Sequence, residues 1–336
     1  MHKLKKLGTA FILGGFVCAA SAGEAYSDEQ IKTLQTRANQ LLGPIPDKMP
    51  GAEKDSAAKV ELGQRLYNET RLSLNNTMSC NTCHRVDQGL GGVDNLSTSP
   101  GAVQGRGDRN SPTVLNAGFQ LAQFWDGREP DLQAQAKGPI LNPIEMAMPS
   151  ADAVMDRVRA DAAYRELFKE AFPDTSPKLT YENLAEAIAA FERTLVTRDR
   201  FDDFQKGDAE ALSQQELRGL DKFLNMGCTS CHNGALLGGN LYQKAGLVNA
   251  YPNFSDLGRE KVTQNEVDKF FFKVPTLRNI EITSPYFHDG GIATLEAAVR
   301  QMAWLQLGQQ ISTEDTHDIV AFLKTLTGKD RRPKSD

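Results

Sequence analysis

Two copies of the pattern Cys-x-x-Cys-His, at residues 80–84 and 228–232, are the part of this sequence best suited to chemistry. This spacing is the attachment signal for c-type haem, in which the two thiols bond to the haem and the adjacent histidine binds its iron. Dithiol and zinc sites also use paired cysteines, but neither explains a histidine directly after both pairs. The motifs therefore predict two covalently bound haem c groups. The residues that hold them are Cys80, Cys83, His84, Cys228, Cys231 and His232.

Residues 1–22 have the pattern of a cleaved secretory signal peptide. Three lysines precede an apolar run that contains Cys18, is too short to span a membrane, and ends on the small residues 20–22. Because c-type haem attachment occurs outside the cytoplasm in bacteria, we predict a periplasmic protein. Removing the three lysines takes the net charge from −5 to −8. This acidity disfavours nucleic acid binding; it could steer a basic partner or simply maintain solubility.

An internal repeat divides the rest of the chain into two halves. Each half has a Gly-x-x-x-aromatic pattern before its haem motif, at residues 63–67 and 219–223. Each half also closes on a run typical of a helix with one buried face, at residues 188–195 and 319–326. The small glycine beside an aromatic residue would allow the first and last helices of each half to cross closely.

These patterns predict the fold class and the domains. Since alternating strand patterns are nearly absent, we expect an all-α protein of two cytochrome c-like domains, each enclosing one haem, with long loops. The predicted domains are residues 23–197 and residues 208–336. A charged run at 198–207 is the predicted link.

A sixth iron ligand must come from a small set of residues. Beyond residue 22, the only histidines outside the two motifs are His288 and His317. His317 is expected on a solvated helix face, and His288 lies in a turn where a hydrogen-bonded structural role is more usual than iron binding. Met302 lies on the amphipathic run 295–305, where core packing is the usual role of a methionine and axial ligation is the alternative.

At this point the sequence resembles the bacterial dihaem cytochrome c peroxidases, a family that also contains the MauG-type enzymes. The resemblance covers about residues 59–328. Its most specific stretches are residues 109–113, 123–128, 142–146 and 285–288. It implies an N-terminal haem where peroxide reacts and a C-terminal haem that relays electrons with histidine and methionine ligands. Met302 matches the relay methionine, where MauG-type enzymes have tyrosine.

The resemblance implies roles for further residues. Glu145 matches an acid-base residue that moves a proton from the near to the far oxygen of peroxide, and Gln135 matches its hydrogen-bonding neighbour. Trp125 matches an aromatic residue between the haems that could relay electrons, although core packing is the norm for tryptophan. A calcium ion is implied at the domain interface. The residues that match its site are Asn110, Thr283 and Pro285.

One departure from the family concerns the loop at residues 85–108. Many of these peroxidases block the resting N-terminal haem with a histidine from this loop, and alignment places that position near Ala102. The loop here contains no histidine, methionine or cysteine. We therefore expect an open first iron and peroxidase activity without prior reduction.

The expected function is reduction of hydrogen peroxide to water with electrons from a small periplasmic cytochrome c or a cupredoxin. A MauG-like enzyme that oxidises residues of a partner protein is an alternative, which the open first haem permits and Met302 disfavours. A pure dihaem electron carrier is a third reading, but it leaves Glu145 and Gln135 without a purpose. Homodimers are common in the family, although no residue in the sequence identifies an interface.

Overall fold

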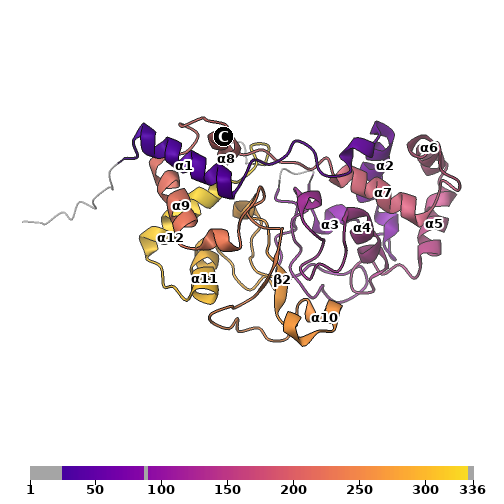
Figure 1. Ribbon diagram of the computed structural model, residues 1–336. Coiled ribbons are helices and arrows are strands. Elements are labelled where there is room, and N and C mark those ends of the chain that lie inside the picture. The colour runs from indigo at the N-terminus through magenta and orange to yellow at the C-terminus, as the bar shows by residue number, and fades with distance from the viewer. Residues whose placement is uncertain (1–24, 87–89, 332–336) are drawn as a thin grey trace, which may run out of the picture.

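The computed structural model describes residues 25–86 and 90–331, so the predicted signal peptide and Cys18 lie outside the described residues. Two groups of helices stand at opposite ends of the molecule, with long loops and a small two-stranded sheet between them (Figure 1). The mostly helical class with long loops is therefore confirmed. No helix within the described ranges is long and apolar enough to cross a membrane.

The helices are short and capped. Ten of the α-helices in the described ranges begin after a Ser, Thr or Asp whose side-chain oxygen accepts a hydrogen bond from the first turn; the two four-residue helices do not. The α-helices are α1 (Asp28–Leu41), α2 (Ala57–Tyr67), α3 (Cys80–Cys83), α4 (Leu132–Leu141), α5 (Ala151–Ala160), α6 (Ala162–Ala171), α7 (Tyr181–Glu192), α8 (Arg200–Gln205), α9 (Gln214–Asn225), α10 (Glu260–Thr263), α11 (Leu295–Leu307) and α12 (Thr313–Lys324). The 3-10 turns are η1 (Ala52–Lys54), η2 (Thr70–Leu72), η3 (Ala117–Phe119), η4 (Cys228–Ser230), η5 (Glu266–Asp268) and η6 (Ile280–Ile282). Strands β1 (Tyr242–Lys244) and β2 (Phe271–Lys273) pair antiparallel.

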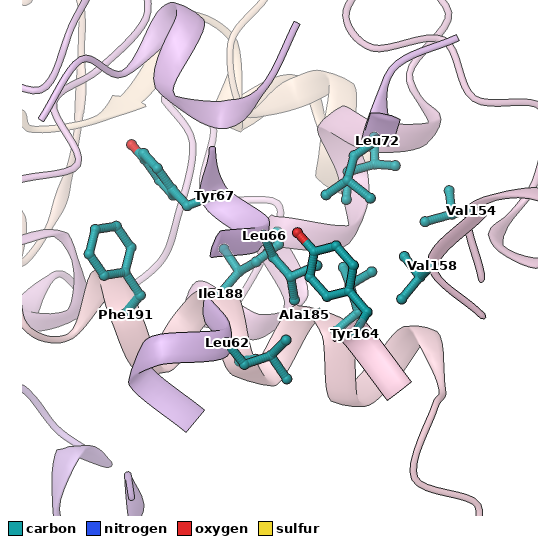
Figure 2. Packing of buried hydrophobic residues seen from close by; sticks show 14 of the residues in the cluster. Leu62, Leu66, Tyr67, Leu72, Val154, Val158, Tyr164, Ala185, Ile188 and Phe191 are labelled. Carbon is teal, nitrogen blue, oxygen red and sulfur yellow. The ribbon is translucent and has the colours of Figure 1, made fainter. Parts of the chain in front are cut away.

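Helices α2 and α7 form the centre of the first helix group. They cross closely because Gly63 faces α7, and a Cβ atom at Gly63 would lie 1.8 Å from the backbone oxygen of Ala187. One turn later, the ring of Tyr67 packs edge-on against Phe191, with ring centroids 5.1 Å apart. Apolar residues of α5 and α6 complete this core (Figure 2). The predicted close crossing of the first and last helices is confirmed for this half.

Helices α9 and α12 repeat that arrangement in the second group. A Cβ atom at Gly219 would lie 1.9 Å from the backbone oxygen of Asp318. The rings of Phe223 and Phe322 then pack with centroids 5.3 Å apart. Matching the two crossings aligns α7 with α12, so that Ala187 corresponds to Asp318 and each following residue corresponds to the next.

Helix α1 packs in the second core, whereas the predicted boundaries assign residues 23–197, which include it, to the first domain. Its apolar residues recur every three or four positions, and Ile31, Leu34 and Ala38 are buried in the second core beside α8 and α9. Figure 1 shows α1 against the second helix group, far from α2. A short apolar stripe suits either core, so tertiary packing decides which one it joins.

The run at 198–207 also differs from the charged link that we expect. It contains helix α8, whose Phe201 and Phe204 are fully buried in the second core. Two of its carboxylates are paired with an arginine of the second half, because Arg278 donates to Asp199 at 2.6 Å and to Asp202 at 2.7 Å. The charged run at 198–207 therefore forms a helix that is buried through its phenylalanines and its paired carboxylates.

Candidate functional site

Both Cys-x-x-Cys-His motifs adopt a tight single turn. In each motif the histidine N–H donates to the backbone oxygen of the first cysteine at 2.9 Å, from His84 to Cys80 and from His232 to Cys228. All four motif cysteines are unbridged thiols. The local fold therefore leaves both pairs of thiols available for bonds to a haem.

The imidazoles of both motifs are held by backbone carbonyl groups. The Nδ1 atom of His84 lies 3.3 Å from the oxygen of Gly92, and that of His232 lies 3.0 Å from the oxygen of Leu237. Burial lowers the pKa of both histidines, which favours the neutral ring. A neutral imidazole that donates from Nδ1 keeps the lone pair of Nε2 for a metal, so the geometry suits iron ligation.

A large, mostly apolar cavity adjoins the second motif. His232 and both of its neighbouring cysteines line the cavity, together with side chains of α9, α11 and α12. Helix α11 presents one continuous face, with contacts every three or four residues. The lining residues of α11 include Leu295, Ala298, Val299, Met302 and Ala303. Met302 therefore shares a cavity with His232, as a His/Met iron site requires.

Polar groups inside this cavity support a haem as its occupant. Lys273 is buried there, donates to the side chain of Gln120, and has its pKa lowered to about 7 by burial. His288 is also buried, and its Nε2 atom has no hydrogen-bond partner among the described residues. Cationic and N–H groups in an apolar cavity suit the carboxylates that haem carries. The residues present therefore fit a haem.

The two remaining histidines have different environments. His288 stacks on Phe272, with ring centroids 4.2 Å apart, so the expected hydrogen-bonded role is replaced by aromatic packing with an unpaired Nε2. His317 is exposed on α12, in line with the expected solvated face.

The turn that contains His288 has a counterpart in the first half, 163 residues earlier. Residues 124–127 and 287–290 share the pattern Phe-x-Asp-Gly, with φ of 66° and 70° at the phenylalanines. At the same separation, Asn116 and Asn279 both donate to the Thr197 hydroxyl, at 2.9 and 3.0 Å. The two halves are thus related residue by residue through this region, and the same separation pairs α4 with α11.

This pairing defines the first site. It matches Met302 with Pro139, and Ala298 with Gln135. Proline has no side-chain atom that can bind iron, so the first half lacks a ligand where the second has a thioether. Gln135 stands where the second half has Ala298, which lines the second cavity. Pro139 is a residue that sequence reasoning missed, although the repeated Phe-x-Asp-Gly pattern was the signal that could have found it.

Glu145 follows α4 in a turn in which its N–H donates to the oxygen of Asn142 at 3.0 Å. Its own backbone oxygen accepts from the N–H of Ala102 at 2.7 Å, so the loop without a blocking ligand packs directly on the Glu145 segment. Burial raises the pKa of Glu145, although the positive charge of Arg128 opposes this. Burial, with a smaller contribution from Glu145, also raises the pKa of the Cys83 thiol to about 11. Glu145 therefore lies near the first motif.

Trp125 stands at the second cavity, on the turn that leads to Arg128. Its Nε1 donates to the backbone oxygen of Asn110 at 2.8 Å, and its ring lies 6.4 Å from that of His288. On the other side of the turn, the guanidinium of Arg128 lies 3.4 Å from the ring centroid of Phe124 and acts on Glu145. This turn therefore connects the surroundings of Glu145 with the second cavity.

The three residues predicted to bind calcium lie close together. Asn110, Thr283 and Pro285 all line the second cavity, and Asn110 is buried. The Nδ2 atom of Asn110 donates to the oxygen of Leu96 at 2.8 Å, which leaves Oδ1 as the acceptor. No cluster of three acidic, histidine or cysteine ligands occurs within the described ranges, and a site of amide and backbone oxygens would not form one.

Comparisons with known proteins agree with this arrangement. Residues 57–210 match the family of di-haem cytochrome c peroxidases. The chain is 48% identical over 294 residues to the cytochrome c551 peroxidase of Nitrosomonas europaea, with 87% of this chain and 85% of that protein covered. It is 33% identical over 324 residues to the methylamine utilization protein MauG of Methylorubrum extorquens, with 92% and 88% covered.

A solved structure of a MauG-like protein associated with microbial copper homeostasis is also similar. Its TM-score is 0.75 at 29% identity, and the match covers 85% of this chain and 94% of that one. The fold and the paired sites define an oxidoreductase with two haem groups. The chain belongs to the di-haem cytochrome c peroxidase family and acts on peroxide.

Proposed function

We propose that the protein is a periplasmic peroxidase that reduces hydrogen peroxide to water with electrons from a small cytochrome c or a cupredoxin. The observation that carries this proposal is the contrast between Met302 and its counterpart Pro139. A His/Met site is suited to electron relay, because a thioether ligand raises the haem potential. The first site instead combines an open position with Gln135 and a partly buried Glu145. The two haem c groups would be attached through the motif cysteines, with His84 and His232 as the proximal iron ligands.

Bound haem would supply the iron that binds peroxide and exchanges electrons. The chain's own groups handle the protons. The raised pKa of Glu145 brings the carboxyl closer to the working pH, so it can accept a proton from the near oxygen of peroxide and return it to the far oxygen. Gln135 can hold peroxide by hydrogen bonds but cannot shuttle its proton, so its role is orientation.

Electrons would enter at the second haem and cross through the turn that carries Trp125. The indole of Trp125 is fixed by its hydrogen bond to the backbone oxygen of Asn110. The backbone oxygen of Trp125 accepts a hydrogen bond from the backbone N–H of Lys273 at 2.7 Å. A calcium ion bound by Asn110, Thr283 and Pro285 would stiffen the same interface. A MauG-like reaction on a partner protein is the alternative, and the methionine at position 302 argues against it.

Substitution of Glu145 by glutamine tests the proposal. Glutamine keeps the size of the side chain but cannot carry the proton, so peroxide turnover with reduced cytochrome c should fall roughly 10²-fold or more while both haems remain attached. Gln135→Ala should cost less. Glu166→Gln, on the exposed surface of α6, is the matched control and should leave turnover unchanged. Near-full turnover by Glu145→Gln with intact haems would refute the assigned role.

The resting oxidised protein should contain one high-spin and one low-spin haem. The first iron would lack a strong-field sixth ligand because position 139 is proline and the loop at 85–108 has no histidine, methionine or cysteine, whereas Met302 would complete the second. Electron paramagnetic resonance of the untreated protein checks this. Two low-spin signals, or a lag in turnover that prior reduction removes, would contradict an open first site.

A further inference from the structure

Helix α7 carries a buried acid that the proposed reaction does not use. Glu192 is only 4% exposed. It continues the stripe of Ala185, Ile188 and Leu195, which recur at helical spacing and are buried in the first core with Cys80 packed against them. A single glutamate in such a stripe is unfavourable unless something compensates its burial.

The second half shows what this position faces. The matched crossings at Gly63 and Gly219 place Ala187 with Asp318 and Phe191 with Phe322, so Glu192 corresponds to Leu323. Leu323 lines the second cavity, where Met302 and His232 also lie. By this correspondence, Glu192 faces the first haem where Leu323 faces the second. Its charge also contributes to the raised pKa of the Cys80 thiol, after burial, which places it near the first motif.

One oxygen of the Glu192 carboxyl, Oε2, lacks a hydrogen-bond partner among the described residues. The neighbouring Arg193 is engaged elsewhere, with Asp55 at 2.6 Å and Glu186 at 3.0 Å. Burial raises the pKa of Glu192 to about 8, against the opposing charge of Arg193. The side chain therefore holds a proton near neutral pH unless a positive charge faces it, in which case the carboxylate is favoured.

Charged and titratable groups of the helices packed on α7 are also committed. Lys59 of α2 and Lys137 of α4 pair with other glutamates of α7, at 3.9 and 3.0 Å. Tyr67 of α2 donates to the backbone oxygen of His84, and Arg157 of α5 donates to backbone oxygens near η2. In the proposed reaction, the group near Glu192 whose charge changes is the iron of the first haem.

We propose that Glu192 couples reduction of the first haem to the binding of one proton. The electron from the donor lowers the charge of the iron by one, and the Glu192 carboxylate binds one proton from water, so the charge enclosed in the first core stays constant. Oxidation releases the proton. The inference rests on the proposed attachment of the first haem at Cys80 and Cys83. The second half has no acid at this position, because Leu323 cannot bind a proton.

Redox titration of both haems as a function of pH tests this coupling. With one proton bound per electron, each tenfold change in proton concentration shifts the first potential by up to about 59 mV. The potential of the first haem should therefore fall as pH rises toward the pKa of Glu192. Glu192→Gln and Glu192→Leu should flatten this slope and leave the second haem unchanged. Glu182→Gln, an exposed acid on the same helix, is the control and should keep the wild-type slope.

A second measurement uses the unmodified protein. The infrared difference spectrum between its reduced and oxidised forms should show the carbonyl stretch of a protonated carboxylic acid, and Glu192→Gln should lack that band. Mass spectrometry of the haem-bound peptides separates the two proposals. Absence of haem at Cys80 and Cys83 would overturn both, whereas an attached haem with the wild-type pH slope in Glu192→Gln would overturn only the role of Glu192.

Discussion

Helices α4 and α11 occupy the same place in the two halves and begin in the same way. Asp131 and Thr294 cap them, and the next residue of each is a buried leucine. They diverge seven residues further on, where α4 has Pro139 and α11 has Met302. A common frame thus carries a thioether in one half and, at the same position of the other, a proline that cannot bind iron. The difference between the two sites therefore lies in a few cavity-facing residues rather than in the fold.

Helices α7 and α12 also occupy matching places in the two halves and differ at a single important position. Each crosses a facing helix at a glycine, where an added Cβ atom would lie under 2 Å from a backbone oxygen of α7 or α12. Each also has an aromatic residue beside this crossing. Glu192 and Leu323 follow that aromatic residue. The first half therefore contains a group that can exchange a proton, and the second half is apolar at the same position.

Replacing Pro139 by methionine should break the comparison most strongly. The substitution gives the first half the residue that the second half uses, and it removes a proline from a helix interior. We expect the high-spin signal of the resting protein to become low-spin and peroxide turnover to be nearly abolished. Electron paramagnetic resonance and steady-state turnover measure the two effects.

The control for that substitution is Gln133→Met on the same helix. Its counterpart, Glu296, does not line the second cavity, so a methionine there should not reach the iron. A Pro139→Met protein that stays high-spin and fully active would show that the correspondence between α4 and α11 does not extend to the haem.

Replacing Met302 by histidine should alter the second half alone. Imidazole stabilises ferric iron better than a thioether does, so the second potential should fall by a fraction of the roughly 0.8 V that axial ligands span. Both haems should remain attached, and electron delivery to the first should slow. A redox titration gives the potentials. An unchanged second potential would mean that Met302 only packs in the core.

The smallest expected effect is on stability. Because the pKa of Glu192 is raised from 4.5 to about 8, folding favours its protonated form. Its contribution is fully present below about pH 4.5 and is lost as pH rises through 8, so the wild type should lose stability relative to Glu192→Gln over that range. Thermal unfolding of both proteins should show a difference of roughly a few degrees at alkaline pH that vanishes in acid. Parallel profiles would contradict a buried protonated acid.

Local patterns predicted the parts of the molecule that depend on neighbouring residues. The glycines at 63 and 219 predicted the two helix crossings. The loop at 85–108 lacks a ligating side chain, and this could be read directly. These features depend on the size or chemistry of single side chains, which a sequence states.

Features that depend on distant packing escaped prediction. The apolar stripe of α1 fits either core, and the charges of α8 conceal two buried phenylalanines. No role was assigned to Glu192 from the sequence, because burial of a charge is decided by the helices packed around it. Its correspondence to Leu323 can be recognised only when the two helix crossings are aligned.

The packing of α1 also has a consequence for the order of folding. The chain enters the second core with α1, leaves it to build the whole first half, and returns with α8 to complete it. The residues that bury Ile31 and Leu34 are synthesised more than 150 positions later, so this contact closes a very long loop. The first half can form around its haem motif while α1 still exposes its apolar stripe. A truncated chain that ends before α8 would therefore keep the apolar face of α1 exposed and would tend to aggregate.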